Sequence, residues 1–321
     1  MPHWKTILTY DGSPYNGWQI QPALPTVQGT LAQAIHRITG ETVLPQGSGR
    51  TDTGVHALAQ VATFSLTAPI PAANLHRALN RALPPSIRIL SVEPVPQDFH
   101  ARHSARRKTY EYRILPCESH PEDRICPPML APYVWAYRFP LELAPLQQAA
   151  AHVLGTHDFS SFAAVDPDLT TRTRSQQETA PAESTSTHTP APQNIITNDI
   201  ITNNAVTNDL SASAKKSTVI STVVGELADE VEKPASLTPI PTDNTRTIFH
   251  SAWHQSEDLL IYRVTGSGFL HHMVRNLVGT FVETATRLDP DVIPKILAAR
   301  NRSAAGPTAP ARGLFLVEVE Y

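Results

Sequence analysis

A long polar stretch divides the chain into two parts that can each contribute to a hydrophobic core. Between residues 176 and 243 there is no Phe, Trp or Tyr, and Thr, Ser, Ala, Asn and Pro dominate from about residue 166 onward. Such a stretch cannot bury enough apolar surface to offset the entropy lost when its backbone becomes ordered. We therefore predict a disordered insertion at about 166–243 and expect the fold to be built from the residues on either side.

The same stretch dominates the net charge of the chain, which is −3. Residues 176–243 carry nine acidic residues and three lysines, whereas the other 253 residues carry 23 basic and 20 acidic ones. The net charge of the whole chain therefore does not exclude a nucleic-acid partner for the folded part.

Membrane and secreted classes are not indicated by this sequence. It has no run of about 18 apolar residues, and its start lacks the apolar segment of a signal peptide. Its two cysteines form neither a disulfide framework nor a paired-cysteine zinc site. We expect a cytoplasmic protein with no membrane contact.

Apolar spacing predicts strands and helices on both sides of the insertion. Thr26 is a candidate N-cap for a helix that ends at Gly40, and residues 269–282 have the spacing of a long amphipathic helix. Residues 314–321 alternate as a strand. The elements fall into two blocks, 1–105 and 106–321, which predict an α+β protein with two similar halves.

The peptide 49–57, GRTDTGVHA, is the strongest candidate for chemistry. Glycines bracket Arg50 and Asp52 directly before a predicted strand, which suits a loop that approaches another surface closely. A loop aspartate beside an arginine can be a nucleophile that its partner keeps ionised. On spacing alone, a structural aspartate that caps a turn is an equally open interpretation.

Further segments resemble one known family, the TruA-type tRNA pseudouridine synthases that act on the anticodon stem-loop. Besides the loop at 49–57, the matching segments are YDGSPYNGWQ at 10–19, DFHAR at 98–102, KTYEY at 108–112, DFSSF at 158–162, GFLHHMVRN at 268–276 and AGPTAPARGL at 305–314. They occur in the family's order and cover both predicted ordered parts, so the resemblance is specific.

The resemblance implies a fold of two ferredoxin-like halves, whose antiparallel sheets meet at a central RNA-binding cleft. It implies that Asp52 is the catalytic nucleophile for conversion of uridines 38, 39 and 40 to pseudouridine, without metal or cofactor. The glycosidic bond breaks, the base turns, and it rejoins through C5. A stacked base is out of reach, so the uridine must be flipped out. Attack on the ribose and attack on the uracil ring both remain open, and a homodimer that binds tRNA is implied.

The same resemblance implies roles for four further residues. Tyr110 would stack on the uracil and help remove the C5 proton, and Arg275 would pair with Asp52. Leu314 would close the pocket beneath the base, although an ordinary core leucine looks the same in sequence. Arg50 lies close enough to Asp52 to reach a phosphate or the vacated stack.

A basic cluster next to Tyr110 is a candidate RNA contact. Its members are Arg102, His103, Arg106, Arg107, Lys108 and Arg113, of which we take Arg106, Arg107 and Lys108 as substrate-binding. His271 and His272 suggest a metal, but adjacent residues on a helix point about 100° apart. We therefore expect no metal site there.

Two other functions stay open at this stage. A non-catalytic tRNA-binding chaperone could keep the same fold, and an aspartate-based phosphotransferase is a weaker alternative because its acidic metal-binding set is missing. The motif Thr-Arg-Thr occurs at 171–173 and at 245–247. We take the second copy as the start of the strand that follows the insertion.

Overall fold

The computed structural model describes residues 1–116, 125–164 and 243–321, and its main compact unit comprises residues 1–168 and 242–321. All of the predicted insertion except residue 243 lies outside the described residues, as does the first Thr-Arg-Thr copy. None of the helices in the described part of the chain has the length and apolar content that a membrane crossing needs.

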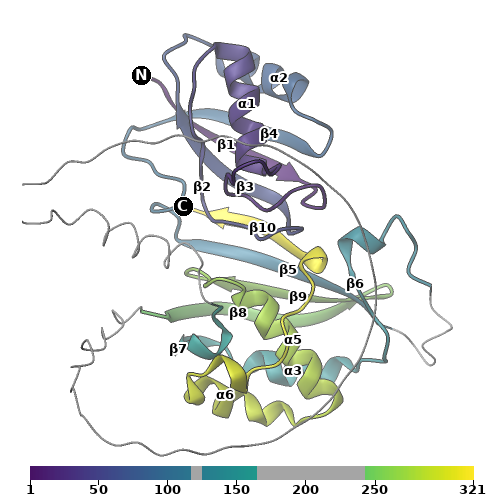
Figure 1. The fold of residues 1–321 in the computed structure, drawn as a ribbon. Helices are drawn as coiled ribbons and strands as arrows, with labels where there is room; N and C mark the ends of the chain where they lie inside the picture. Colours follow the sequence, from purple (N-terminus) through teal and green to yellow (C-terminus); the bar gives the residue numbers. More distant parts are fainter. Residues whose placement is uncertain (117–124, 165–242) are drawn as a thin grey trace, which may run out of the picture. The chain divides into compact units, whose positions relative to one another are not determined.

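One mixed β-sheet organises this unit (Figure 1). Strands follow one another in the order β4-β1-β3-β10-β5-β9-β8-β7, with β2 paired to β3 and β6 paired to β5. The strands are β1 (His3–Tyr10), β2 (Gln46–Gly47), β3 (His56–Ser65), β4 (Ile87–Val95), β5 (Arg107–Pro116), β6 (Trp135–Tyr137), β7 (Gly155–Asp158), β8 (Thr245–Ser256), β9 (Leu259–Gly266) and β10 (Leu314–Glu320). The second Thr-Arg-Thr copy does begin a strand, β8.

The C-terminal strand joins the two parts of the sheet. β10 pairs in parallel with β3, Phe315 lying opposite His56, and in antiparallel with β5, Leu314 lying opposite Tyr112. The expected antiparallel sheets are therefore continuous with each other through a parallel pair. This pairing places the loop that precedes β3 beside the loop that precedes β10.

In the described part of the chain, the α-helices that pack on the sheet are α1 (Val27–Thr39), α2 (Ala72–Ala82), α3 (Leu143–Ala151), α5 (Met273–Thr286) and α6 (Ile293–Ala299). Figure 1 shows α1 and α2 beside β1, β3 and β4, and α3, α5 and α6 near β7, β8 and β9. The predicted limits of α1 are confirmed, because the Thr26 hydroxyl accepts from the Gly29 amide and Gly40 ends the helix at φ 75°.

The long helix α5 begins four residues later than its apolar spacing predicts. Phe269 packs edge-on against Tyr110, with ring centroids 5.0 Å apart, and His272 has a left-handed backbone at φ 59°. A helix cannot pass through a left-handed residue, so it starts at Met273. From there Met273, Leu277 and Phe281 are fully buried and anchor the helix in the core.

Candidate active site

The loop between β2 and β3 carries Asp52 and is held by the segment that follows β1. The Tyr10 hydroxyl lies 2.8 Å from the Thr51 hydroxyl, and the Trp18 amide donates to the Thr51 carbonyl at 3.0 Å. Gly17 has φ 81°, and a Cβ there would lie 2.5 Å from the Thr51 carbonyl oxygen. Only glycine permits this approach, so the two motifs YDGSPYNGWQ and GRTDTGVHA form one structural unit.

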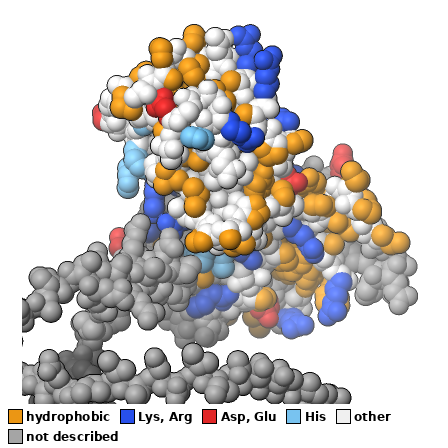
Figure 2. Space-filling model, turned by 45° about the horizontal axis from the view of Figure 1, so that its top comes forward, with side chains coloured by type: hydrophobic (Ala, Val, Ile, Leu, Met, Phe, Trp, Pro, Cys, Tyr) orange, Lys and Arg blue, Asp and Glu red, His pale blue; other side chains and the backbone are white. Residues whose placement is uncertain are grey.

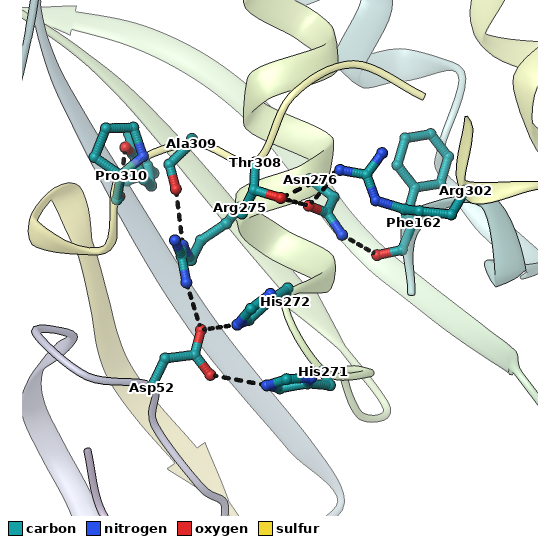
Figure 3. A network of polar contacts seen from close by, with 11 residues as sticks. Asp52, Phe162, His271, His272, Arg275, Asn276, Arg302, Thr308, Ala309 and Pro310 are labelled. Carbon is teal, nitrogen blue, oxygen red and sulfur yellow. Dashed lines mark hydrogen bonds and ion pairs between the residues drawn. The ribbon is translucent and has the colours of Figure 1, made fainter. Parts of the chain in front are cut away.

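Arg275, in the first turn of α5, reaches across to this loop. Its Nη1 donates to Asp52 Oδ2 at 2.9 Å, and its Nε donates to the Ala309 carbonyl at 2.8 Å (Figure 3). The Ala309 amide in turn donates to the Arg275 carbonyl at 3.1 Å. The guanidinium is thus oriented by the loop before β10, and its charge faces a carboxylate that is only 21% exposed.

A buried amide keeps the loop before β10 against α5. Asn276 is fully buried and donates to the Phe162 carbonyl at 2.8 Å. Its oxygen accepts from the Thr308 hydroxyl at 2.7 Å and from Arg302 Nη2 at 3.1 Å (Figure 3). Since Asn276 is the neighbour of Arg275, this network fixes the position from which Arg275 approaches Asp52.

His271 and His272 also point at Asp52, and the expectation that they diverge on a helix is wrong. They precede α5, and their rings are stacked with centroids 3.9 Å apart. His271 Nε2 lies 3.7 Å from Asp52 Oδ1, and His272 Nε2 lies 3.3 Å from Oδ2. Burial lowers the pKa of His272 more than the Asp52 carboxylate raises it, so its ring is neutral at neutral pH.

Tyr110 lies in β5 beside the same loop. Its hydroxyl is 4.0 Å from the position that a Cβ on Gly49 would take, and the side chain is 8% exposed. Burial, with smaller contributions from Tyr10 and Asp52, raises the pKa of Tyr110, so the phenol is neutral at neutral pH. Tyr112, two residues further along, instead donates its hydroxyl to the Pro310 carbonyl at 2.7 Å. Of the two tyrosines, it is Tyr110 that lies next to the loop with Asp52.

The remaining predicted site residues are less closely gathered. Leu314 begins β10 and is buried at 6% exposure, whereas Arg50 and Arg106 are exposed. The Arg107 guanidinium lies over the Phe249 ring at 4.7 Å. Lys108 points inward and donates from Nζ to the Ser48 carbonyl at 2.5 Å, and burial lowers its pKa to about 8.

The predicted basic cluster is consequently not one uniform surface. Arg113 pairs with Glu111 at 2.8 Å and covers the Phe315 ring at 4.0 Å. Figure 2 likewise shows Lys and Arg side chains in several separate groups on the visible face. Within the described residues, Arg102, His103, Arg106 and Arg107 are its solvent-exposed members.

The sequence analysis did not assign a role to His56, the first residue of β3, which directly follows the loop with Asp52. It is 1% exposed, its Nδ1 accepts from the Gly12 amide at 3.0 Å, and its Nε2 donates to the Pro132 carbonyl at 3.0 Å. Burial lowers the pKa of His56, and Asp11 opposes this only in part. The position of His56 in the GRTDTGVHA motif was the available signal. For His271 and His272 the sequence held no such signal, because both lie inside the helix predicted over 269–282, whereas α5 begins at Met273.

Comparison with known proteins agrees with this geometry. The chain matches the sequence model of the tRNA pseudouridine synthase family over residues 7–104 and 235–321. It is 39% identical over 317 residues to tRNA pseudouridine synthase A of Solibacter usitatus (strain Ellin6076), covering 99% of this chain and 98% of the relative.

Two further relatives carry the same description. Identity is 37% over 324 residues with tRNA pseudouridine synthase A of Moorella thermoacetica, covering all of both chains. It is 32% over 316 residues with the protein of that name from Thermoanaerobacter sp. (strain X514), covering 98% of each. The family match includes both the loop with Asp52 and the helix with Arg275, and the chain therefore belongs to the tRNA pseudouridine synthase family.

Proposed function

We propose that this protein converts uridines 38, 39 and 40 of the tRNA anticodon stem-loop to pseudouridine, with Asp52 as the nucleophile. The chain is an isomerase of the tRNA pseudouridine synthase family, and its partner is tRNA. The observation that carries the assignment to Asp52 is its partly exposed carboxylate, which Arg275 holds at 2.9 Å and which lies near enough to Tyr110 to contribute to raising the pKa of that phenol.

The reaction needs no net change in composition. The N1–C1′ bond of uridine breaks and a C5–C1′ bond forms, while C5 loses a proton and N1 gains one. A carboxylate can bond covalently to the substrate in the first step and leave again in the last. Attack at the ribose and attack at the uracil ring both satisfy this balance.

We assign Tyr110 to stacking on the flipped uracil, Leu314 to the floor of the pocket, and Arg50 to the RNA backbone or the vacated stack. A neutral phenol stacks without an electrostatic penalty and can donate a hydrogen bond. Because burial raises the pKa of Tyr110, its phenol must pass on its own proton before it can accept the one from C5.

Arg106 and Arg107 have exposed side chains that suit phosphate contact in the RNA-bound state. The Lys108 ammonium donates to the Ser48 carbonyl and so lies under the catalytic loop. We therefore propose that Lys108 attracts the RNA by its positive charge and does not bind a phosphate directly.

The domain organisation is also a proposal. We assign residues 1–105 and 106–321 to two ferredoxin-like halves, the second interrupted by an insertion at about 166–243. The order β1-α1-β2-β3-α2-β4 in the first part supports the assignment, since it is the order of elements in a ferredoxin-like unit. The cytoplasmic location is inferred from the sequence features given above, and the homodimer from the resemblance alone. Light scattering on the purified full-length chain tests the oligomeric state.

The central experiment compares Asp52→Asn with wild type. Asparagine keeps the shape and removes the nucleophilic charge, so release of tritium from C5-labelled uridine in tRNA should fall to background. Filter binding at fixed salt should change by less than about tenfold, because phosphate contacts elsewhere dominate RNA affinity. Glu257→Gln, at the exposed β8–β9 turn, is the control and should retain full turnover.

The outcomes separate the enzyme from the alternative. A wild-type protein that binds tRNA without releasing tritium would be the non-catalytic chaperone. An Asp52→Asn protein that still turns over would remove Asp52 from its assigned role.

A further inference from the structure

The proposed function gives no role to His271 and His272, although both lie beside Asp52. The pair is held by backbone hydrogen bonds on both sides: the Ala164 amide donates to the His271 carbonyl and the Asn276 amide to the His272 carbonyl. His272 has a left-handed φ of 59°, and its ring lies against that of His271 with 33° between the ring planes. Two imidazoles therefore present their Nε2 atoms to the same carboxylate (Figure 3).

The distances between these atoms match those of ligands around one metal ion. With metal–ligand bonds of about 2.0–2.2 Å, two ligands of a tetrahedral site lie roughly 3.3–3.5 Å apart. His271 Nε2 lies 3.7 Å from Asp52 Oδ1, His272 Nε2 lies 3.3 Å from Oδ2, and one donor atom from each of the three side chains lies within 4.8 Å of the others. Because the two imidazoles face different carboxylate oxygens, the His272 ring must turn from Oδ2 toward an ion that binds Oδ1.

The chemistry of the donors favours a borderline-soft cation. Two imidazole nitrogens and one carboxylate oxygen suit Zn²⁺ better than Mg²⁺ or Ca²⁺, which prefer all-oxygen sites. An imidazole must be neutral to bind a metal, so the affinity of this site should fall as the pH falls. Both rings are about three-tenths exposed, so an ion can enter from solvent.

Arg275 affects both the oxygen that is left for an ion and the affinity of the site. Its Nη1 binds Asp52 Oδ2, which leaves Oδ1, the oxygen that faces His271, for an ion. The guanidinium repels a dication, and this repulsion weakens binding relative to a closed structural zinc site. Three ligands also leave a fourth position for water, so occupancy should be reversible.

We propose that Asp52, His271 and His272 form an inhibitory zinc site, in which Zn²⁺ occupies the carboxylate that would otherwise attack the substrate. Among the described residues, this is the one group of three His, Cys, Asp or Glu side chains with suitable spacing. The inhibitory effect rests on the proposed function of Asp52, whereas binding of the ion does not. Turnover in this scheme needs no metal, and the ion acts only by blocking the nucleophile.

The binding test uses chelator-treated full-length protein and isothermal titration with Zn²⁺, with Co²⁺ absorption as a second probe of tetrahedral geometry. His271→Gln, His272→Gln and Asp52→Asn should each weaken binding at least about tenfold, because each removes one of three ligands. His254→Gln, an exposed histidine on β8, should bind as wild type does. Thermal melts verify that the variants are folded.

The activity test adds Zn²⁺ to the tritium-release assay, after pre-incubation of the protein, and then adds chelator. Inhibition should follow the occupancy measured by titration and should be reversed by the chelator. A dissociation constant weaker than about 100 µM for wild type, or equal binding by the histidine variants, overturns the site. Tight binding with undiminished turnover overturns the inhibition, and if Asp52→Asn is also active, the failure lies in the proposed function and not in the zinc site.

Discussion

Gly279→Ala should destabilise this protein, although the same change in an exposed helix stabilises it. Gly279 lies on the buried face of α5, where a Cβ would overlap the Pro307 carbonyl oxygen and lie 2.9 Å from its carbon. These are backbone atoms of the loop before β10, so no side chain can rotate away. The loop must move outward, and with it the Ala309 carbonyl that orients Arg275.

The size of the effect follows from three contributions. Alanine gains about 1 kcal/mol over glycine in a helix interior. Overpacking costs about 1–3 kcal/mol, and the two hydrogen bonds between Arg275 and Ala309 are worth about 0.5–1.5 kcal/mol each. We expect a net loss of about 1–5 kcal/mol in the free energy of unfolding, which lowers the melting temperature by roughly 2–20 °C.

Activity should fall further than stability suggests. A misplacement of about 1 Å in a positioning group can cost about 100-fold in rate, so kcat should drop by roughly 10- to 100-fold with tRNA affinity nearly unchanged. Urea denaturation and single-turnover tritium release measure the two effects. Thr286→Ala, exposed at the end of the same helix, controls for helix propensity and should stay within about 0.5 kcal/mol of wild type. A Gly279→Ala protein as stable and as active as wild type would refute the close approach and its link to Arg275.

Three further predictions concern buried polar groups. Asn276→Ala removes the amide to which Phe162, Arg302 and Thr308 are hydrogen-bonded. The free energy of unfolding, measured by urea denaturation, should fall by about 2–4 kcal/mol. Burial lowers the pKa of His56 below its usual 6.5, so the unfolded chain takes up the proton at a higher pH than the folded chain does. The free energy of unfolding should therefore decrease as the pH falls below about 6.5, and that of His56→Gln should depend less on pH. Lys108 has a folded pKa of about 8 against 10.5 unfolded, so wild-type stability should rise relative to Lys108→Met between those two pH values.

Each of these has a clear contrary result. A loss below about 1 kcal/mol for Asn276→Ala would mean that solvent replaces its partners. Parallel stability profiles for wild type and His56→Gln between pH 5 and 7 would show that His56 is not buried as a neutral ring. A constant stability difference across the alkaline window would place the Lys108 ammonium in solvent.

Local elements could be predicted because their signals lie within a few residues. The Thr26 cap and the Gly40 end of α1 are examples, since one turn of chain contains both the hydrogen-bonding group and its partner. The motif with Asp52 could also be recognised in the sequence. The same holds for Arg275, a charged residue in an apolar helix that requires an acidic partner. These features depend on spacing along the chain and not on which segments meet.

Other features were decided by contacts between distant segments. The apolar spacing of 269–282 continues through Phe269, but that side chain packs on Tyr110 from another strand and the helix starts at Met273. The start of α5 decides the direction of His271 and His272, which is why they converge on Asp52 and do not diverge.

The sequence by itself determined the helices with local caps, the alternating strands and the motif that carries the candidate nucleophile Asp52. Only the tertiary structure decided that β10 enters between β3 and β5, that Lys108 turns inward to Ser48, and that two histidines share the carboxylate with Arg275. Periodicity and capping are properties of neighbouring residues, whereas strand pairing and side-chain convergence depend on the packing of segments that are more than 200 residues apart, as Phe315 and His56 are. No local pattern encodes such contacts.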